Sequence, residues 1–351
     1  MIKKTILNIL FALLFPVVLS AQEATLFKQH NMKRWGIPAG NYSGITNLGD
    51  GRYALVSDKQ NEDGWTEVSI GFLPSGDIGK GLFIDNHLSK KPLSKSRDCE
   101  GIAYVPEGSF FVAAESSQQI LELSPNGEPT NRTLAVPACF SKNNIFPNYG
   151  FESLAYNREN SIFWTTTEQG LKSDVSAPSS PENPQPTLLR LQSFDANLKP
   201  LHQYAYKTDA PIMKKSGRHY AFGVSEILVV NDTTLLVMER ELNIPKNYNR
   251  AKCYIRIYSV FPERQQPITD TSKPLSELNA SEFISKKLVC SFSTGFRLFG
   301  KKNLANYEGM CLGPKQDGSR QCIILVADSQ NRAGNAFYHL KDCVKALDFR
   351  P

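Results

Sequence analysis

Acidic side chains recur in this chain at the two ends of short strand-like segments. Four glutamates open such segments, and five acids close them. The opening residues are Glu100, Glu152, Glu226 and Glu308, and the closing residues are Asp58, Glu115, Glu168, Glu239 and Asp328. If the segments lie side by side in the same direction, up to nine carboxylates meet at one place. Carboxylates at such short distances repel one another, so protons, basic side chains or a cation must neutralise them.

Calcium suits such a cluster, because Ca²⁺ takes about six to eight oxygen ligands. A bound Ca²⁺ orients a substrate oxygen, polarises a phosphoryl or carbonyl group and helps to activate water. The candidate metal ligands are Asp58, Glu100, Glu152, Glu168, Glu226, Glu239, Glu308 and Asp328. A structural role is the alternative, in which glutamates at strand starts accept hydrogen bonds from backbone N–H groups of the next unit.

Basic residues near these acids have two possible roles. A guanidinium binds a phosphate through two hydrogen bonds, but it also neutralises a carboxylate. The candidate substrate-binding residues are Arg97, Arg218, Arg240 and Arg332. His219 lies near the head of one segment and has the chemistry of a general base, with a plain loop histidine as the alternative. The candidate catalytic residues are therefore Glu100, Glu152, Glu308 and His219.

Two common catalytic signatures are absent from the sequence. The chain contains no G-x-S-x-G elbow and no P-loop. A serine hydrolase of the elbow type and a P-loop nucleotide-binding protein therefore lack their main sequence signal.

The segments that position the acids form a repeat. Each copy opens with a small or acidic residue, then Gly or a similar residue and an apolar pair, and continues as strand, turn and strand. The five copies are 43–58, 100–115, 152–168, 226–239 and 308–328. Turn-forming residues lie at the middle of every copy, as a hairpin with opposed ends requires. These turns are Asp50-Gly51, Pro106-Glu107-Gly108, 157–160, Asn231-Asp232 and Asp317-Gly318.

Further strand-like runs follow each hairpin. They are 65–72 and 82–87, 119–123 and 133–136, 188–194 and 202–206, 253–260 and 287–292, and 336–340. The last unit is one strand short, and the N-terminal run 24–29 can supply that strand and close a ring. The sequence thus predicts an all-β fold, a β-propeller of four-stranded antiparallel blades, with five blades and six as the alternative. A β-sandwich or a β-helix is the rival, but a sandwich does not repeat one motif at the head of every unit.

Residues 1–21 have the pattern of a secretory signal peptide. Two lysines precede an apolar run at 6–19, and Ser20-Ala21 supplies the small residues of a cleavage site. A membrane anchor is the alternative, but the run is too short to span a bilayer comfortably. We therefore expect residues 22–351 to form one propeller domain that is secreted or periplasmic, with no transmembrane anchor after cleavage.

Charge and cysteine content narrow the class further. Removal of residues 1–21 takes away two lysines and no acid, so the net charge falls from +6 to +4. This mild charge does not suggest a nucleic-acid partner, and a small-molecule ester or phosphoester is expected instead. The cysteines have no C-x-x-C spacing, which leaves a zinc site unsupported, and their odd number leaves at least one thiol unpaired. They are Cys99, Cys139, Cys253, Cys290, Cys311, Cys322 and Cys343.

Several motifs together resemble the family described as esterase-like activity of phytase. They are Tyr42-Ser43-Gly44-Ile45 with Val56-Ser57-Asp58, Asp98-Cys99-Glu100-Gly101-Ile102-Ala103, Asn148-Tyr149-Gly150-Phe151-Glu152-Ser153-Leu154-Ala155, Gly223-Val224-Ser225-Glu226 with Leu235-Leu236-Val237-Met238-Glu239-Arg240, and Asn306-Tyr307-Glu308-Gly309-Met310 with Val326-Ala327-Asp328-Ser329-Gln330-Asn331. The resemblance implies an exported propeller-like domain that hydrolyses phosphate or other esters. It singles out Glu100, Glu152, Glu168, Glu239, Glu308, Asp328 and Arg240. One departure is Ser153, where the family favours glycine.

Two functions remain open on this basis. The first is a Ca²⁺-dependent hydrolase of phosphate or carboxylic esters at the acidic end of the channel. The second is a non-catalytic binding propeller that recognises a glycan, a peptide or an envelope partner, which the polar insertions 172–186 and 262–281 favour. Ester turnover that depends on Ca²⁺ separates the two.

Overall fold

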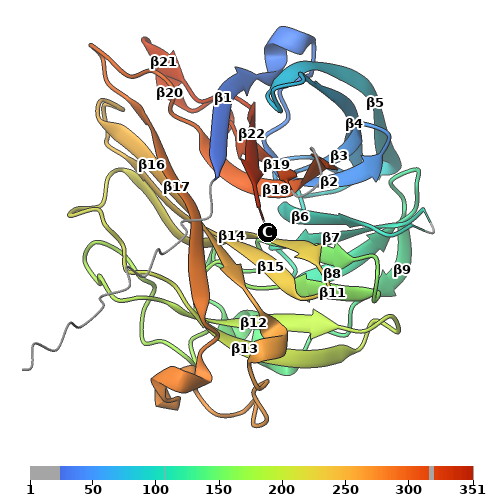
Figure 1. Ribbon diagram of the computed structural model, residues 1–351, viewed down its shortest axis with the longest axis vertical. Coiled ribbons are helices and arrows are strands. Elements are labelled where there is room, and N and C mark those ends of the chain that lie inside the picture. Colours follow the sequence, from blue (N-terminus) through green and yellow to red (C-terminus); the bar gives the residue numbers. More distant parts are fainter. Residues whose placement is uncertain (1–23, 107, 316–319, 351) are drawn as a thin grey trace, which may run out of the picture.

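Five antiparallel sheets form a ring in the computed structural model, which describes residues 24–106, 108–315 and 320–350 (Figure 1). Each sheet has four strands and is one blade, numbered I to V in chain order. The five-bladed all-β propeller predicted from the repeat is therefore confirmed. The predicted signal peptide 1–21 and the turn residues Glu107 and Asp317-Gly318 lie outside the described residues.

Each blade begins with the hairpin of one repeat copy, whose first strand is innermost. Blade I contains β2 (Tyr42–Gly49), β3 (Arg52–Ser57), β4 (Glu62–Phe72) and β5 (Ile78–Pro92). Blade II contains β6 (Cys99–Tyr104), β7 (Phe110–Ala114), β8 (Gln119–Leu123) and β9 (Pro129–Thr133). Blade III contains β10 (Ala155–Asn157), β11 (Ile162–Thr165), β12 (Leu188–Phe194) and β13 (Pro200–Lys207).

The remaining blades are built in the same way. Blade IV contains β14 (His219–Asn231), β15 (Thr234–Ile244), β16 (Ala251–Val260) and β17 (Lys286–Phe296). Blade V contains β18 (Asn306–Lys315), β19 (Gln321–Asp328), β22 (Cys343–Phe349) and β1 (Thr25–Asn31). The first strands of neighbouring blades contact one another around the whole ring, from β2 through β6, β10, β14 and β18 back to β2.

Short elements decorate the loops between the blade strands. A small hairpin joins β20 (Gly334–Asn335) to β21 (Tyr338–His339). The helical turns are all of the 3₁₀ type: η1 (Met32–Trp35), η2 (Ala138–Phe140), η3 (Lys142–Asn144), η4 (Pro262–Arg264), η5 (Leu275–Glu277) and η6 (Ala280–Glu282). None of the helices in the described ranges has the length and apolar character needed to cross a bilayer.

The N-terminal strand closes the ring as predicted. Strand β1 pairs antiparallel with β22 at the outer side of blade V, so the two ends of the chain hold one sheet together (Figure 1). The prediction of a third strand at 336–340 is wrong, because that range lies in the turn and second strand of the β20–β21 hairpin. The third strand of blade V is β22, which pairs with β19. All seven residues of β22 are buried. Likewise β9 ends at Thr133, so 134–136 follows the outer strand of blade II instead of forming it.

The hydrophobic core is divided among the blade interfaces. In the described residues it falls into five clusters, and each cluster joins residues of two adjacent blades. Met238 and Ile255 of blade IV, for example, pack with Tyr307 and Leu325 of blade V. A blade cannot bury both faces of its sheet alone, so stacking around the ring supplies the burial that stabilises each one.

The hairpin turns have the geometry that their residues favour. Asp50 and Gly51 both have positive φ angles, 51° and 73°, as a two-residue type I′ turn requires. Gly49 pairs with Arg52 across this turn.

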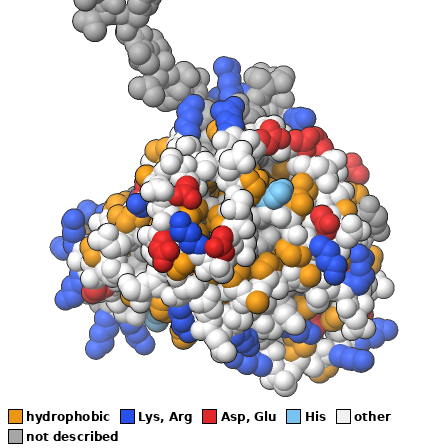
Figure 2. Space-filling view, turned by 90° about the horizontal axis from the view of Figure 1, so that it is seen from below, with side chains coloured by type: hydrophobic (Ala, Val, Ile, Leu, Met, Phe, Trp, Pro, Cys, Tyr) orange, Lys and Arg blue, Asp and Glu red, His pale blue; other side chains and the backbone are white. Residues whose placement is uncertain are grey.

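The seven cysteines are all free thiols. The face that includes blade III carries basic and acidic side chains interspersed with scattered hydrophobic ones (Figure 2).

Candidate functional site

A β-bulge at the head of the blades sets the positions of the repeated acids. In blades I, II, IV and V one extra residue of the inner strand interrupts the pairing with the second strand. The bulged residues are Ser43, Glu100, Ser225 and Glu308, and Glu152 follows the Phe151–Thr167 bridge at the same place in blade III. A bulge re-aims a side chain locally, which turns these residues toward one end of the channel.

The fourth repeat copy is offset by one residue from its predicted alignment. Glu226 pairs with Met238, and Glu239 pairs with Val224. Compared with the other blades, Ser225 therefore takes the head position and Arg240 takes the strand-end position. Because successive side chains of a strand point to opposite faces, a shift of one residue moves both predicted acids away from the common site.

In blades I, II and V the residue after the bulge is a glycine that approaches the next blade too closely for a side chain. A Cβ atom on Gly44 would lie 2.7 Å from the Glu100 carbonyl oxygen, and one on Gly101 would lie 2.6 Å from the Leu154 nitrogen. A Cβ atom on Gly309 would lie 2.6 Å from the Ser43 carbonyl oxygen. Blade III has Ser153 at this position and blade IV has Glu226. Glycine here keeps the inner strands close, which brings the bulged residues of all blades together.

Most of the bulged and strand-end residues line one hollow of about 420 Å³, which we call the acidic cavity. Every blade contributes to its walls. Its lining is Asp58, Lys59, Asp98, Glu100, Glu115, Pro147, Asn148, Tyr149, Glu152, Glu168, Tyr220, Ala221, Arg240, Glu308 and Gln330. Of the acids and arginines singled out from the sequence, the structure thus brings together Asp58, Glu100, Glu115, Glu152, Glu168, Arg240 and Glu308.

Arg240 is the central cation of the acidic cavity. Its guanidinium donates to Glu168 of blade III and to Glu308 of blade V, and to the Asn306 side chain at 3.2 Å. It is buried, with only 4% of its side chain exposed, and its carboxylate partners are equally buried. A buried charge of this kind must be paired, and removing one member of such a network leaves uncompensated charge. Arg240 therefore joins three blades across the channel.

A second group of charges lies on the other side of the acidic cavity. Asp58, Asp98 and Glu100 each present a carboxylate oxygen within 4.8 Å of the other two. The Lys59 ammonium contacts Asp58 and donates to Asp98 at 3.0 Å. Asp98 has a left-handed backbone with φ of 58°, a conformation that aspartate tolerates better than most residues. Three carboxylates at this spacing can share one cation.

Burial sets the protonation of the acidic cavity. Burial raises the pKa of Glu168 and of Glu308 to about 7, although the neighbouring Arg240 lowers both. Burial, with Asp58 and Glu308 close by, raises the pKa of Glu100 well above its ordinary value. The pKa of Glu152 is raised in the same way by burial and by Glu168. Some of these carboxyls therefore hold protons near neutral pH, and a cation that binds them must displace those protons.

Several buried polar atoms in the bulges and the acidic cavity lack a partner. Within the described ranges, Asp58 Oδ1, Glu308 Oε2, Arg240 Nε, Ser43 Oγ and Ser225 Oγ make no hydrogen bond. Buried polar groups are nearly always satisfied in folded proteins. Unsatisfied oxygens beside other carboxylates are what a bound cation or its water would satisfy, so this donor set fits calcium.

Three of the proposed acids do not line the cavity. Asp328 is fully buried and accepts from the backbone of Gln330 at 2.9 Å. Burial raises its pKa, and the nearby Glu308 and Asp58 raise it further. Glu226 accepts from the Leu154 nitrogen at 3.3 Å, so it ties adjacent blades together. Glu239 accepts from Tyr206 Oη and from Lys286 Nζ, at 2.7 and 2.6 Å, on the opposite face of β15 from Arg240.

The other basic candidates do not line the acidic cavity. Arg97 is paired with Asp63 of β4, with one of the two hydrogen bonds at 3.0 Å. Arg218 and His219 are exposed at the start of β14, and Arg332 is exposed in the loop before β20. Arg240 is therefore the only one of the four predicted arginines that lines the cavity.

Sequence reasoning passed over several residues of the cavity. Lys59 and Asp98 directly flank residues of the repeat, and their proximity to Asp58 and Glu100 was visible in the sequence. Tyr149, Tyr220 and Gln330 come from loops or strand ends without any repeated pattern. No periodic signal points to them, because each blade supplies a different residue at that place.

Comparison with known proteins places this chain in one family. The family model "Phytase-like: Esterase-like activity of phytase" matches residues 37–330, a range that contains every residue of the acidic cavity. No curated protein matches the chain in sequence.

The similar solved structures are only distantly related to this chain. A luciferin-regenerating enzyme is 10% identical, with 92% of this chain and 95% of that chain covered and a TM-score of 0.40. A streptogramin B lyase is 12% identical (93% and 98% covered, TM-score 0.37), and virginiamycin B lyase from Staphylococcus aureus is 10% identical (93% and 99% covered, TM-score 0.36). Likeness at this level carries no conclusion about chemistry. The family match extends over most of the chain and includes all five repeat heads, and the chain therefore belongs to the phytase-like family.

Proposed function

We propose that this protein is an exported hydrolase of phosphate or other esters that works in the acidic cavity with Ca²⁺. The observation that carries the proposal is the convergence of carboxylates from four blades on one hollow, with buried oxygens of Asp58 and Glu308 left without partners among the described residues. Membership of the phytase-like family supports the ester chemistry.

Asp58, Asp98 and Glu100 are the residues that would hold the cation. Their oxygens lie within 4.8 Å of one another, which suits ligands that share an ion with metal–oxygen distances of about 2.3–2.6 Å. Bound there, Ca²⁺ would supply Lewis-acid polarisation of a phosphoryl or carbonyl oxygen.

The remaining residues of the cavity support proton transfer and orientation. Glu168 and Glu308, with pKa values raised to about 7, can accept a proton from water or return one to a leaving group at neutral pH. Arg240 neutralises both carboxylates, and its Nε–H, which makes no hydrogen bond within the described residues, can donate to a substrate oxygen. Tyr149 and Tyr220 provide walls with polar ends.

Hydrolysis assays with matched variants test the proposal. Purified residues 22–351 would be assayed on a phosphomonoester, phytate, an aryl ester and a lactone, with Ca²⁺ and with a chelator. Glu100→Gln and Glu308→Gln should lower turnover at least tenfold. Glu122→Gln, whose carboxylate pairs with Arg132 outside the cavity, should not. Turnover that survives both cavity variants and the chelator would overturn the proposal.

Export is tested separately. The segment 1–21 is proposed as a cleaved signal peptide. The protein recovered outside the cytoplasm of a producing cell should therefore have the mass of a chain that begins at Gln22. Recovery of the full-length chain in the cytoplasm would contradict this part of the proposal.

A non-catalytic binding propeller is the second candidate. It is favoured by the cations already in the cavity, since Arg240 and Lys59 pair with four of its carboxylates. Such pairing is what a purely structural role of these acids requires. Ca²⁺ that does not change the melting temperature, together with no turnover on any ester, would favour this function.

A further inference from the structure

A second hollow, of about 430 Å³, lies further along the same inner strands, and we call it the apolar cavity. One residue from each blade forms its inner ring, directly after the glycine or its replacement. These residues are Ile45, Ile102, Leu154, Ile227 and Met310, all at most 2% exposed. The bulges that aim polar residues to one end of the channel are thus followed by side chains that make the other end apolar.

The two cavities are separate compartments. They share no lining residue within the described ranges. The residues between them are the closely packed Gly44, Gly101 and Gly309, with Ser153 and Glu226. The Glu226 carboxyl accepts hydrogen bonds from the backbone of blades III and IV. A ligand of the apolar cavity therefore contacts other residues than a ligand of the acidic cavity.

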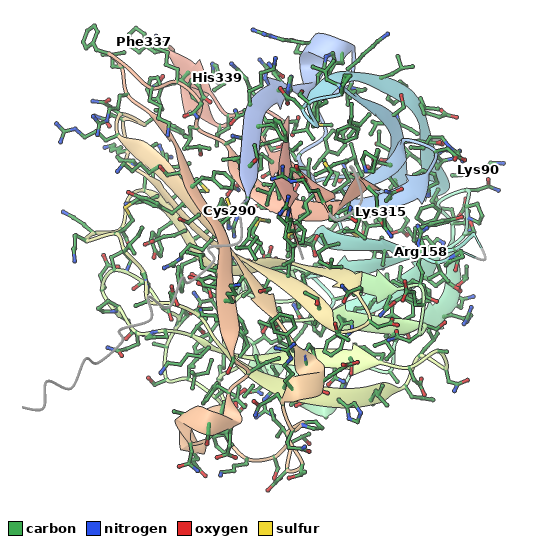
Figure 3. The ribbon with its side chains drawn as sticks, in the orientation of Figure 1. Lys90, Arg158, Cys290, Lys315, Phe337 and His339 are labelled. Atoms are coloured by element: carbon green, nitrogen blue, oxygen red, sulfur yellow. The ribbon has the colours of Figure 1, made fainter. Side chains whose placement is uncertain are left out.

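The entrance of the apolar cavity is basic. Arg158, in the β10–β11 turn, lies over the Tyr104 ring at 5.3 Å and donates to the Asn47 carbonyl of blade I. Lys315, the last residue of β18, lines the same entrance, and both side chains are exposed (Figure 3). Neither forms an ion pair with any described carboxylate. Glu159 is the one acid in the described lining, so the two cations outweigh it.

We propose that the apolar cavity is a binding site for an amphipathic anion, whose hydrocarbon body contacts the apolar part of the lining and whose carboxylate or phosphate meets Arg158 and Lys315. The volume lies in the range of about 300–1,000 Å³ that is usual for small-molecule sites, and the lining combines apolar side chains with polar and charged ones. A guanidinium that is held against an aromatic ring, with donors to spare, is well suited to an anionic head group. This site is independent of the function proposed for the acidic cavity.

Calorimetric titration of the mature chain with three ten-carbon probes tests the proposal. Decanoate and decyl phosphate carry the two head groups, and decanol carries none. We expect one molecule of decanoate or decyl phosphate to bind per chain, with decanol at least tenfold weaker. The preferred head group identifies which anion the site takes. An absence of saturable binding for both anions, or decanol that binds as tightly as they do, overturns the proposal.

Variants locate the site. The double variant Arg158→Gln with Lys315→Gln changes exposed side chains only, and it should weaken anion binding at least tenfold without changing decanol binding. Leu312→Trp places a bulky indole ring in the wall and should block all three probes. Lys90→Gln is the matched control, because Lys90 is exposed on β5 and lies outside the cavity (Figure 3). Equal affinity in the double variant and the wild type, or an equal loss in the control, contradicts the proposed site.

Discussion

Removal of the Lys59 ammonium should strengthen calcium binding in the acidic cavity. Lys59 contacts Asp58 and donates to Asp98 at 3.0 Å, and both carboxylates belong to the group of three proposed to hold the cation. A Ca²⁺ ion at that place must displace the ammonium. Lys59→Gln removes both the competition and the repulsion between like charges.

The size of the effect follows from the exposure of the lysine. Its side chain is 43% exposed, so solvent screens both ion pairs. Exposed pairs contribute about 0.2–1 kcal/mol each, and two of them contribute about 0.4–2 kcal/mol. Since 1.4 kcal/mol is a factor of ten, the variant should bind Ca²⁺ about 2- to 30-fold more tightly.

The assay is a calorimetric titration of Ca²⁺ into chelator-treated protein at pH 8. A pH above 7 is needed, because the ammonium lowers the pKa of Asp58, and its loss lets protons compete more strongly with the metal. Lys90→Gln serves as control for the loss of one positive charge. An affinity at pH 8 that is unchanged or weaker in Lys59→Gln would refute the assignment of Ca²⁺ to Asp58, Asp98 and Glu100.

Three further predictions concern stability, each measured by thermal or denaturant unfolding. First, the folded metal-free protein holds protons on Glu168 and Glu308 up to a pKa of about 7, whereas the unfolded chain releases them near 4.5. The free energy of unfolding should therefore fall as the pH rises from about 4.5 to 7, by at most about 3 kcal/mol for each carboxyl, and a flat profile contradicts this. Second, Glu226→Ala should destabilise the protein by about 1–3 kcal/mol, because the backbone N–H groups of Leu154 and Ile227 lose their acceptor, while Glu226→Gln keeps an acceptor oxygen and should cost less. Equal losses in the two variants would show that the hydrogen bonds are not the cause. Third, Gly101→Ala should cost about 1–3 kcal/mol, since its Cβ would lie 2.6 Å from the Leu154 nitrogen, whereas the control Gly71→Ala, whose Cβ would lie 3.9 Å from its nearest neighbour, should cost less. A similar loss in both would contradict close packing of the inner strands as the reason.

Local sequence predicted the blades well, because a hairpin is specified by neighbouring residues. Turn residues such as Asp50 and Gly51 adopt positive φ angles that few other residues tolerate, and the apolar strands on each side need only to pair with each other. Five such hairpins in succession, each followed by further strand-like runs, predicted a propeller. The N-terminal strand was recognisable because the fifth unit was one strand short.

The strand register of the fourth copy could not be predicted from the sequence. In the fourth copy acids stand at both Glu226 and Glu239, so the repeat could be aligned on either side of a one-residue shift. The bulge at Ser225 decides between them, and a bulge depends on how the inner strand packs against its neighbours. The same packing turns Glu239 toward Lys286 and Tyr206, and it leaves Arg240 to face the channel.

By itself, the sequence predicted a propeller of five blades with six as the alternative, the residues at four of the five repeat heads, and the accumulation of acids at one end of the inner strands. Only the tertiary structure decided which acids meet, which cations neutralise them and which end of the channel is apolar. The physical reason is distance along the chain: Glu168, Arg240 and Glu308 come from three blades, and they touch only when the ring closes. Burial in that closed ring, which no single hairpin provides, then raises the pKa values of the carboxyls.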